Sequence, residues 1–316
     1  MESFDGKLAV VTGGGTGMGR ELVLQLLAQG CAVATCDVIL ENLEETARLA
    51  AEQSPGVTLT THRADVSVED DVMRFRDEVL AQHATDHVNL VFNNAGVGGG
   101  GSFVLGDRAE WERTFNICWG GVYNGCRAFV PLLVAAPEGH LVNTSSVNGF
   151  WASLGPGVPH TSYSAAKFAV KGFSEALLED FRINAPHVSV SVVMPGHIGT
   201  DIVKNSQTIL ASTEGPGTPE GLSSARESMA RRGMDVSAMT DEQIAQMGEM
   251  MATMFRESAP LSAAGAATII LDNVKAGNWR ILVGDDAHRL DEQVRADPLS
   301  AYGAEGISLF EFMQNG

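Results

Sequence analysis

The sequence predicts an α/β domain in which helices cover both faces of a parallel sheet. Short apolar runs alternate with segments of helical periodicity over about the first 200 residues, and a glycine-rich turn separates the first run from the first helical segment. The chain has 316 residues, of which 44% are hydrophobic, so it can bury a large core. We expect one doubly wound domain over residues 1–316, with a seven-stranded parallel sheet, an excursion at about 200–258 and a tail at about 286–316.

The expected strands are short and continuously apolar, as in sheets that are buried on both faces. They lie at residues 7–12, 31–38, 57–61, 88–92, 140–144, 188–193 and 280–283. The expected helices carry apolar side chains at three- and four-residue steps, such as Leu22 and Leu26 in the first and Ile244, Met247 and Met251 in the sixth. These helices lie at residues 17–30, 41–53, 68–83, 107–134, 162–184, 241–257 and 262–275.

The regular alternation of strands and helices stops at Pro195. Residues 200–237 include several glycines and prolines, among them the run 215–217, so we expect a loop-rich segment there. Near the end of the chain, residues 307–313 are rich in Phe and Leu, and we interpret them as a hydrophobic tail that adds to a dimer contact.

Charge and cysteine content exclude several classes of partner. The formal net charge is −18, and a field of that sign repels nucleic-acid phosphates and anionic lipid surfaces. Cys31, Cys36, Cys118 and Cys126 form no C-x-x-C pair and accompany no histidine cluster, so we expect no metal site and a reducing compartment. Neither a signal-peptide pattern nor an apolar run of membrane-spanning length is present. The sequence therefore predicts a cytoplasmic protein without nucleic-acid or membrane partners.

The turn after the first strand has the composition of a dinucleotide-binding loop. Residues 12–19 read Thr-Gly-Gly-Gly-Thr-Gly-Met-Gly and open a helix, whose N-terminal N–H groups attract a pyrophosphate. Asp37 ends the second strand, where a carboxylate accepts hydrogen bonds from the adenosine ribose hydroxyls. Because that carboxylate repels a 2′-phosphate and the turn itself contains no basic residue, the pattern predicts NAD rather than NADP.

Tyr163 and Lys167 lie four residues apart in a predicted helix and so share one face. An ammonium group close to a phenol favours the phenolate, so we expect the pKa of Tyr163 to lie below its ordinary value of about 10. Such a phenol is a general acid/base near neutral pH.

Together these motifs resemble the short-chain dehydrogenase/reductase family, in its short, non-extended branch. The resemblance is strong over about residues 5–200 and looser over 265–286. It is carried by the glycine turn at 12–19, Asp65-Val66, the Asn-Asn-Ala-Gly motif at 93–96, Asn116, Ser146, Tyr163 with Lys167, and Pro195-Gly196 followed by Ile198 and Thr200.

The resemblance implies a Rossmann-type fold and a role for each matching residue. Tyr163 would exchange a proton with the substrate oxygen, and Lys167 would lower the pKa of Tyr163 and bind the nicotinamide ribose. Ser146 would orient the substrate oxygen, and Asn116 would hold a water that links Lys167 to solvent. The residues implied to contact NAD are Gly13, Thr16, Gly17, Met18, Gly19, Asp37, Asp65, Val66, Asn93, Ala95, Gly96, Tyr163, Lys167, Pro195, Gly196, Ile198 and Thr200, with Asp65 binding the adenine amino group.

The spacing between the serine and the tyrosine departs from the family pattern. Ser146 precedes Tyr163 by seventeen residues, whereas the family usually has about a dozen. We interpret the difference as an insertion after the fifth strand, because Ser146 keeps its position at the strand end. Ser145 should point to the opposite side of that strand, and Ser153 is the alternative catalytic serine.

The predicted function is NAD(H)-dependent interconversion of a secondary alcohol and a ketone on a fairly large hydrophobic substrate. The expected pocket-lining stretches are 96–103, 147–160 and 200–255, the last rich in methionine; the methionines could instead pack as core or dimer surface. His160 either contacts the substrate oxygen or is a loop residue without a role in binding. Arg231 and Arg232 are compatible with an alternative substrate that carries a carboxylate or a phosphate. Alternatives are a non-catalytic NAD-binding sensor and nucleotide-sugar epimerase or dehydratase chemistry. The family resemblance implies a homodimer or homotetramer.

Overall fold

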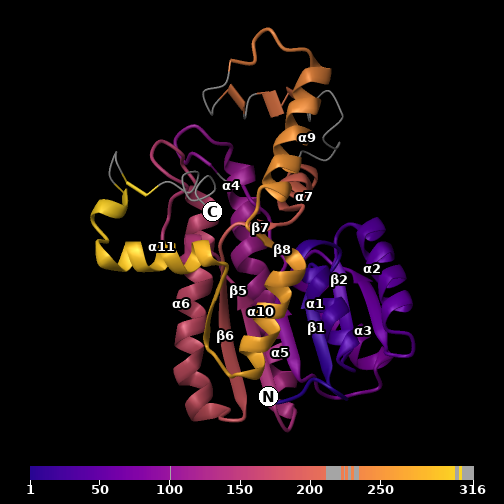
Figure 1. Ribbon diagram of the computed structural model, residues 1–316. Coiled ribbons are helices and arrows are strands. Elements are labelled where there is room, and N and C mark those ends of the chain that lie inside the picture. The colour runs from indigo at the N-terminus through magenta and orange to yellow at the C-terminus, as the bar shows by residue number, and fades with distance from the viewer. Residues whose placement is uncertain are drawn as a thin grey trace.

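A seven-stranded parallel sheet forms the centre of the protein (Figure 1). The computed structural model describes residues 1–99, 101–210, 222–223, 225–226, 229–230, 235–302 and 306–307. The strands run in the order β3-β2-β1-β4-β5-β6-β9, and every neighbouring pair is parallel. Their bounds are β1 Leu8–Thr12, β2 Ala32–Asp37, β3 Leu59–Arg63, β4 Leu90–Asn93, β5 Gly139–Thr144, β6 Val188–Pro195 and β9 Arg280–Val283. The predicted doubly wound sheet is therefore confirmed.

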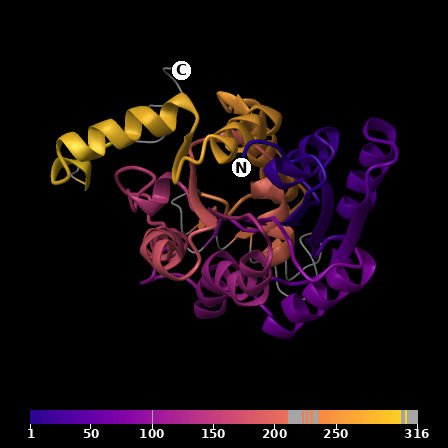
Figure 2. The ribbon, with the colours of Figure 1, turned by 90° about the horizontal axis from the view of Figure 1, so that it is seen from below.

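Helices cover both faces of this sheet because each strand sends alternate side chains to opposite sides. Along β1, Ala9 and Val11 pack with α1 (Gly17–Ala28), α2 (Leu40–Gln53) and α10 (Ala263–Lys275). Val10 packs on the other side with α3 (Glu69–Gln82), α5 (Gly121–Ala135) and α6 (Thr161–Asn184). Figure 2 shows this layered arrangement from below.

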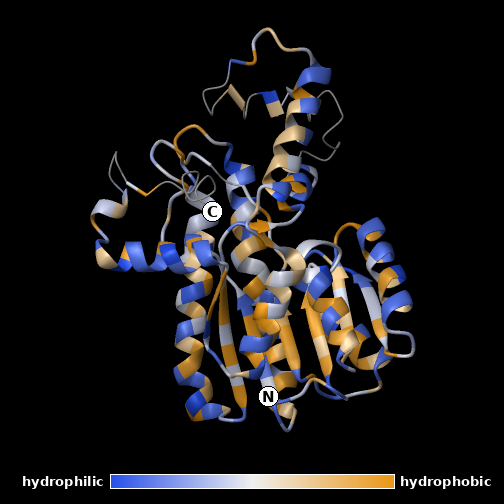
Figure 3. Ribbon diagram, in the orientation of Figure 1, coloured by the Kyte–Doolittle hydropathy of each residue, from blue (hydrophilic) through white to orange (hydrophobic). Residues whose placement is uncertain are grey.

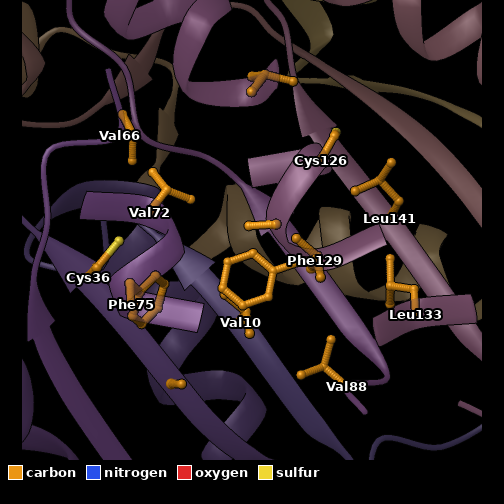
Figure 4. Packing of buried hydrophobic residues seen from close by; sticks show 14 of the residues in the cluster. Val10, Cys36, Val66, Val72, Phe75, Val88, Cys126, Phe129, Leu133 and Leu141 are labelled. Atoms are coloured by element: carbon orange, nitrogen blue, oxygen red, sulfur yellow. The ribbon is translucent and has the colours of Figure 1, made fainter. Parts of the chain in front are cut away.

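The hydrophobic core is concentrated on the strands and on the helix faces that meet them (Figure 3). Figure 4 shows part of the α3–α5 side, where Phe75 and Phe129 pack edge to face with ring centroids 5.5 Å apart. Both side chains are at most 1% exposed. Aromatic rings buried to this degree fix α3 and α5 on the sheet. Because α5 continues from the segment that carries Asn116, this packing also helps to position that residue.

One long helix expected at residues 107–134 is divided in the structure. It consists of α4 (Arg108–Phe115), a π-helical turn at Asn116–Gly120, and α5. Asp107 caps α4 by accepting a hydrogen bond from the Glu110 N–H at 2.9 Å. Because π-turns within α-helices frequently occur at functional sites, the turn at Asn116 supports a functional role for this position.

The second half of the chain contains more helix than the sequence predicts. Part of the expected loop-rich excursion is a helix, α7 (Ile202–Leu210), and the tail begins with another, α11 (Asp285–Ala296), followed by a 3-10 turn at Ser300–Tyr302. The expected helix α9 (Asp241–Glu257) is present and begins with a capping box between Thr240 and Gln243. A two-stranded parallel sheet, β7 (Ile198–Gly199) with β8 (Leu261–Ser262), precedes α10. The glycine- and proline-rich residues 211–221, Arg231, Arg232, Met234 and residues 308–313 lie outside the described residues.

Strand β3 begins two residues later than predicted. The Val57 N–H bonds to the Ser54 carbonyl at 3.3 Å and keeps residues 54–57 in a turn, so pairing with β2 starts at Leu59.

The helices α7 and α9 lie together beyond one end of the sheet (Figure 1). That end is the carboxyl end of the strands, because Ile198 and Ile202 follow directly from the end of β6.

Candidate active site

A cleft opens at the carboxyl ends of β1, β2 and β4, which is where ligands bind in doubly wound sheets. It brings together many of the residues implied to contact the cofactor, namely Gly13, Thr16, Gly17, Met18, Gly19, Asp37, Asp65, Val66, Ala95, Gly96 and Thr200. The wall opposite the glycine turn includes Ile202, Asn205 and Ile209 from α7.

The glycine turn is shaped so that the backbone itself faces the cleft. Gly13 has φ of +70°, and a Cβ there would lie 2.8 Å from the Ala95 Cα. A Cβ on Gly19 would collide with the Gly13 carbonyl oxygen. Thr16 makes no side-chain cap on α1, and no acidic residue occupies the first turn. The N–H groups at the start of α1 are thus available to an anion, and the turn fits a pyrophosphate.

Asp37 lines the same cleft at the end of β2. Its carboxylate accepts hydrogen bonds from the N–H groups of Gly15 at 3.0 Å and Ile39 at 3.1 Å. Burial raises the pKa of Asp37 above its ordinary value, although these bonds and nearby Arg20 act in the opposite direction. Arg20 is thus a cation near Asp37 that the glycine-turn motif did not indicate. Its guanidinium bonds to the Gly15 carbonyl and, at 2.9 Å, to the Thr46 hydroxyl.

Asp65 is held by contacts that the sequence did not indicate. Its carboxylate accepts hydrogen bonds from the Ser67 N–H at 3.0 Å and hydroxyl at 2.7 Å, and pairs with Arg113 at 2.7 Å. Burial acts to raise the pKa of Asp65, but these bonds outweigh it and hold the pKa below its usual value. Arg113 itself lines the cleft. The one sequence signal for Arg113 is its position on the same predicted helix as Asn116, three residues earlier.

Tyr163, Lys167 and Ser146 meet where α6 passes the end of β5. The Tyr163 hydroxyl is hydrogen-bonded to Ser146. Lys167 lies one turn further along α6, with Nζ 5.4 Å from the Tyr163 ring centroid and 2.9 Å from the Thr144 carbonyl oxygen, to which it donates. A Cβ on Gly96 would lie 3.6 Å from Lys167 Nζ, so this group adjoins the dinucleotide cleft.

The structure separates the three candidate serines. Ser145 donates to the Lys167 carbonyl at 2.7 Å, on the side of the strand away from Ser146, as the alternation of side chains predicts. Ser153 bonds within its own loop, to Gly155. Of these three serines, Ser146 is the one that is hydrogen-bonded to Tyr163.

The pKa of Tyr163 lies above its ordinary value, and the expectation that Lys167 lowers it in the free protein is wrong. Burial is the main cause, and the hydrogen bond from Ser146 opposes it only in part. Lys167 is itself buried, which lowers its own pKa, and its ammonium group lies over the ring and donates to a carbonyl rather than to the hydroxyl. Tyr163 is therefore a neutral phenol in the free protein.

Two asparagines of the expected set have different surroundings. Asn116 starts the π-helical turn and its side chain is exposed. Asn93 is 2% exposed, and its side-chain amide donates to Asn143 at 2.9 Å. Since Asn93 contributes no lining to the cleft, its amide holds β4 to β5 within the sheet.

The turn from Pro195 to Thr200 lies against three elements of the second half of the chain. The His197 N–H donates to Asp286 of α11 at 2.6 Å, and its Nε2 bonds to the Phe255 carbonyl of α9 at 2.7 Å. A Cβ on Gly196 would collide with the Asp286 carboxylate, and Thr200 lies beside Gly17. Burial lowers the pKa of His197, so the ring is neutral. Pro195, Gly196 and Ile198 stand behind the cleft rather than in its lining.

Within the described ranges, no group of three His, Cys, Asp or Glu side chains is arranged to hold a metal ion. The helices of that same part of the chain are all too short or too polar to cross a membrane.

A cleft lined by a glycine turn, with a Tyr–Lys–Ser group beside it, is the arrangement expected of a nicotinamide-dependent oxidoreductase. The family model for short chain dehydrogenases matches residues 7–210, and the chain belongs to the short-chain dehydrogenase/reductase family. SadH of Mycobacterium tuberculosis, which carries an oxidoreductase name, is 39% identical over 206 residues, covering 65% of this chain and 72% of SadH.

Two solved structures extend the comparison. A short-chain dehydrogenase/reductase from Burkholderia phymatum in complex with NAD has a TM-score of 0.76 and 27% identity, covering 97% of this chain and 99% of that one. An alcohol dehydrogenase from Thermococcus sibiricus complexed with 5-hydroxy-NADP has a TM-score of 0.53 and 27% identity, covering 61% of this chain and 77% of that one. The family uses a nicotinamide cofactor. One of these two structures holds NAD and the other holds a derivative of NADP.

Proposed function

We propose that this oxidoreductase interconverts a secondary alcohol and a ketone with NAD(H), using Tyr163 as general acid/base. The observation that supports this most strongly is the hydrogen bond between Tyr163 and Ser146 beside Lys167, at the end of the cleft where Gly96 adjoins Lys167 Nζ. When bound there, the nicotinamide supplies or accepts the hydride. The residues of the chain then have to hold the substrate oxygen and move one proton.

Each catalytic side chain has a distinct task in this proposal. In reduction, the neutral Tyr163 phenol donates its proton to the carbonyl oxygen; in oxidation, its phenolate removes the alcohol proton. Ser146 donates a hydrogen bond to the same oxygen and orients it. Lys167 binds the nicotinamide ribose hydroxyls, and Asn116, exposed at the π-helical turn, connects Lys167 to solvent through a water.

The preference for NAD rests on Asp37. Its carboxylate lies in the cleft and is already fixed by the Gly15 and Ile39 N–H groups, so it can accept the ribose hydroxyls without further ordering. A 2′-phosphate would meet a like charge at the same place. Arg20 is the cation that acts on the Asp37 carboxylate, and its guanidinium is directed to Gly15, Asn42 and Thr46 rather than into the cleft.

The substrate is proposed to be a fairly large hydrophobic molecule. Some methionines of the second half support this less than the sequence suggests: Met229, Met239 and Met247 pack with Val236 and Ile244 in a small core of their own. Met250 and Met254 of α9 are 61% and 63% exposed and remain candidates for contact with an apolar ligand.

A homodimer or homotetramer is proposed from the outer faces of two long helices. Val134 of α5, and Phe168 and Ile183 of α6, are exposed large hydrophobic side chains. Apolar side chains gathered on neighbouring helices are a common basis of subunit contact. Sedimentation equilibrium of the purified protein measures the oligomeric state directly.

The test of the function is the substitution Tyr163→Phe, which removes only the hydroxyl. We expect NADH formation with secondary alcohols to fall about 1,000-fold, because general acid/base catalysis contributes about 10²–10⁴-fold. NADH binding, followed by fluorescence titration, should stay within about twofold of the wild-type value. Tyr123→Phe, at an exposed position of α5, is the matched control and should be fully active.

Two other functions give different results in that test. A non-catalytic NAD sensor would bind NADH but oxidise no alcohol even as wild type. An epimerase or dehydratase would convert a nucleotide sugar without net NADH release. Either result would replace the proposed reaction.

A further inference from the structure

Neither the loop between Ser146 and Tyr163 nor the C-terminal segment after α11 has a role in the proton transfer proposed above. The loop is longer than the family usually has, and the segment lies beyond residues 7–210, which the family model matches. In the structure the two pack against each other, although about 150 residues separate them.

Two hydrogen bonds join the loop to the segment. The Trp151 indole donates from Nε1 to the Ala301 carbonyl at 3.1 Å, and the Ala152 N–H donates to the Tyr302 hydroxyl at 3.0 Å. Trp151 has no exposed surface and packs in a cluster with Val147, Ala287, Leu290 and Ala301. A fully buried tryptophan with a satisfied indole fixes the backbone on either side of it.

The same loop is bonded to Ser146. The Asn148 N–H donates to the Ser146 hydroxyl oxygen at 3.1 Å, and the Asn148 side-chain amide donates to the carbonyls of Trp151 at 3.0 Å and Ser153 at 2.7 Å. At its other end the loop reaches His160, whose ring lies 4.7 Å from that of Tyr163. The segment that holds Trp151 therefore also sets the path of the loop between Ser146 and Tyr163.

A cavity of about 350 Å³ lies between the loop and the segment, which is within the range of small-molecule sites. Its lining includes Pro156, Val158, Pro159, Ala301, Tyr302 and Ile307, together with Ser153 and two glycines. None of these described lining residues is charged. The cavity therefore favours an uncharged, largely apolar group over a carboxylate or a phosphate.

We propose that residues 297–302 are a specificity element of the substrate site, in which Trp151 and Tyr302 are positioning residues for the loop 147–159. The cavity between loop and segment takes the uncharged, apolar end of the substrate that is remote from the reacting carbon. This inference rests on the proposed alcohol/ketone chemistry only for the identity of the reacting end. The loop–segment contact itself does not depend on that chemistry.

The first test measures whether the segment fixes the loop. Tyr302→Phe removes one hydrogen bond and keeps the ring, whereas Trp151→Phe removes one hydrogen bond and replaces the indole by a smaller phenyl ring. In both variants, amide hydrogen exchange should become about threefold to tenfold faster in residues 147–159. Exchange in β1 and α1 should not change. Trp279→Phe is the matched control, because Trp279 is 42% exposed and lies just before β9, outside both the loop and the segment. Unchanged exchange in the loop of both variants would overturn the positioning role.

The second test measures whether the cavity takes the remote end of the substrate, with calorimetric binding of 2-butanone and 2-octanone to the enzyme–NAD complex, in which a ketone cannot be reduced. Tyr302→Ala should weaken binding of 2-octanone about fivefold or more and that of 2-butanone less than twofold. In turnover, the same variant should raise the KM for 2-octanol and leave kcat and the Kd for NADH within about twofold. Equal weakening for both ketones, or no ketone binding by the wild type, would overturn the inference.

The results also separate this inference from the proposed function. Ketone binding with the expected length dependence but without turnover would contradict the proposed reaction and leave the specificity element in place. Turnover that depends on Tyr163 but shows no length-dependent change in Tyr302→Ala would do the reverse.

Discussion

The parts of the chain before and after residue 200 build the active site in different ways. Before it, the site residues lie at strand ends, in the glycine turn, at the π-helical turn and on α6, where the sheet and its covering helices fix them. After it, α7 lines the cleft with Ile202, Asn205 and Ile209, whereas α9 and α11 bond to the turn at His197. In the function proposed above, the first part carries the chemistry, whereas the second, together with the loop 147–159, determines access and fit. Substitutions in the two parts should differ accordingly in what they change.

The largest effect after loss of the Tyr163 hydroxyl is expected at Ser146. Ser146→Ala should lower kcat by about 100-fold, because a hydrogen-bond donor to the developing oxygen charge is lost. Ser153→Ala should change kcat less than threefold, since Ser153 bonds only within its loop. Steady-state rates of NADH formation measure both. Full activity of Ser146→Ala with loss of activity in Ser153→Ala would show that the insertion had moved the catalytic serine.

The next effect concerns the cofactor. Asp37→Ser removes the carboxylate and keeps a hydrogen-bonding side chain, so the ratio of kcat/KM for NAD to that for NADP should fall about 30-fold, or about 2 kcal/mol. The loss has two parts: the ribose hydroxyls lose an ionised acceptor, and the 2′-phosphate loses a repelling charge. If the wild type already prefers NADP in initial-rate assays, the role given to Asp37 is wrong.

The pH dependence sharpens the role of Tyr163. Because burial places its pKa above the ordinary value, the phenol is protonated through the neutral range. Alcohol oxidation needs the phenolate, so its rate should rise with pH, by about tenfold per unit while the pH stays below that pKa. Ketone reduction needs the phenol and should not rise over the same range. An oxidation rate that is constant from pH 6 to 8 would contradict this assignment.

The smallest effect is expected from the second part of the chain. Asn205 of α7 donates to the Thr16 hydroxyl at 2.7 Å across the cleft, while Ser206 accepts from the Gly98 N–H at 2.7 Å. Asn205→Ala should raise the KM for NAD about threefold, the value of one hydrogen bond, with kcat unchanged. A change in kcat of tenfold or more would mean that α7 takes part in the chemistry and would remove the contrast between the two parts.

The sequence predicts those site residues that are close in the chain or at strand ends. Tyr163 and Lys167 are one helical turn apart, and the glycine turn follows directly from β1, so spacing alone places them. Arg113, Asp286 and Asn205 escaped prediction because their partners Asp65, His197 and Thr16 are far away in the sequence. The predicted direction of the shift in the Tyr163 pKa was wrong for a similar reason. Burial, which raises this pKa, depends on the whole fold and not on the four-residue spacing to Lys167.

The π-helical turn at Asn116–Gly120 takes up an additional residue within one long helical segment. Such a turn needs about one residue more than an α-turn for the same rotation, so α4 and α5 keep nearly the mutual orientation of a continuous helix. Deleting a single residue from 116–120 would therefore let the segment close into a regular α-helix and leave Arg113 facing Asp65. The geometry within the stretch would change instead, and with it the position of Asn116 relative to the lysine it is proposed to serve.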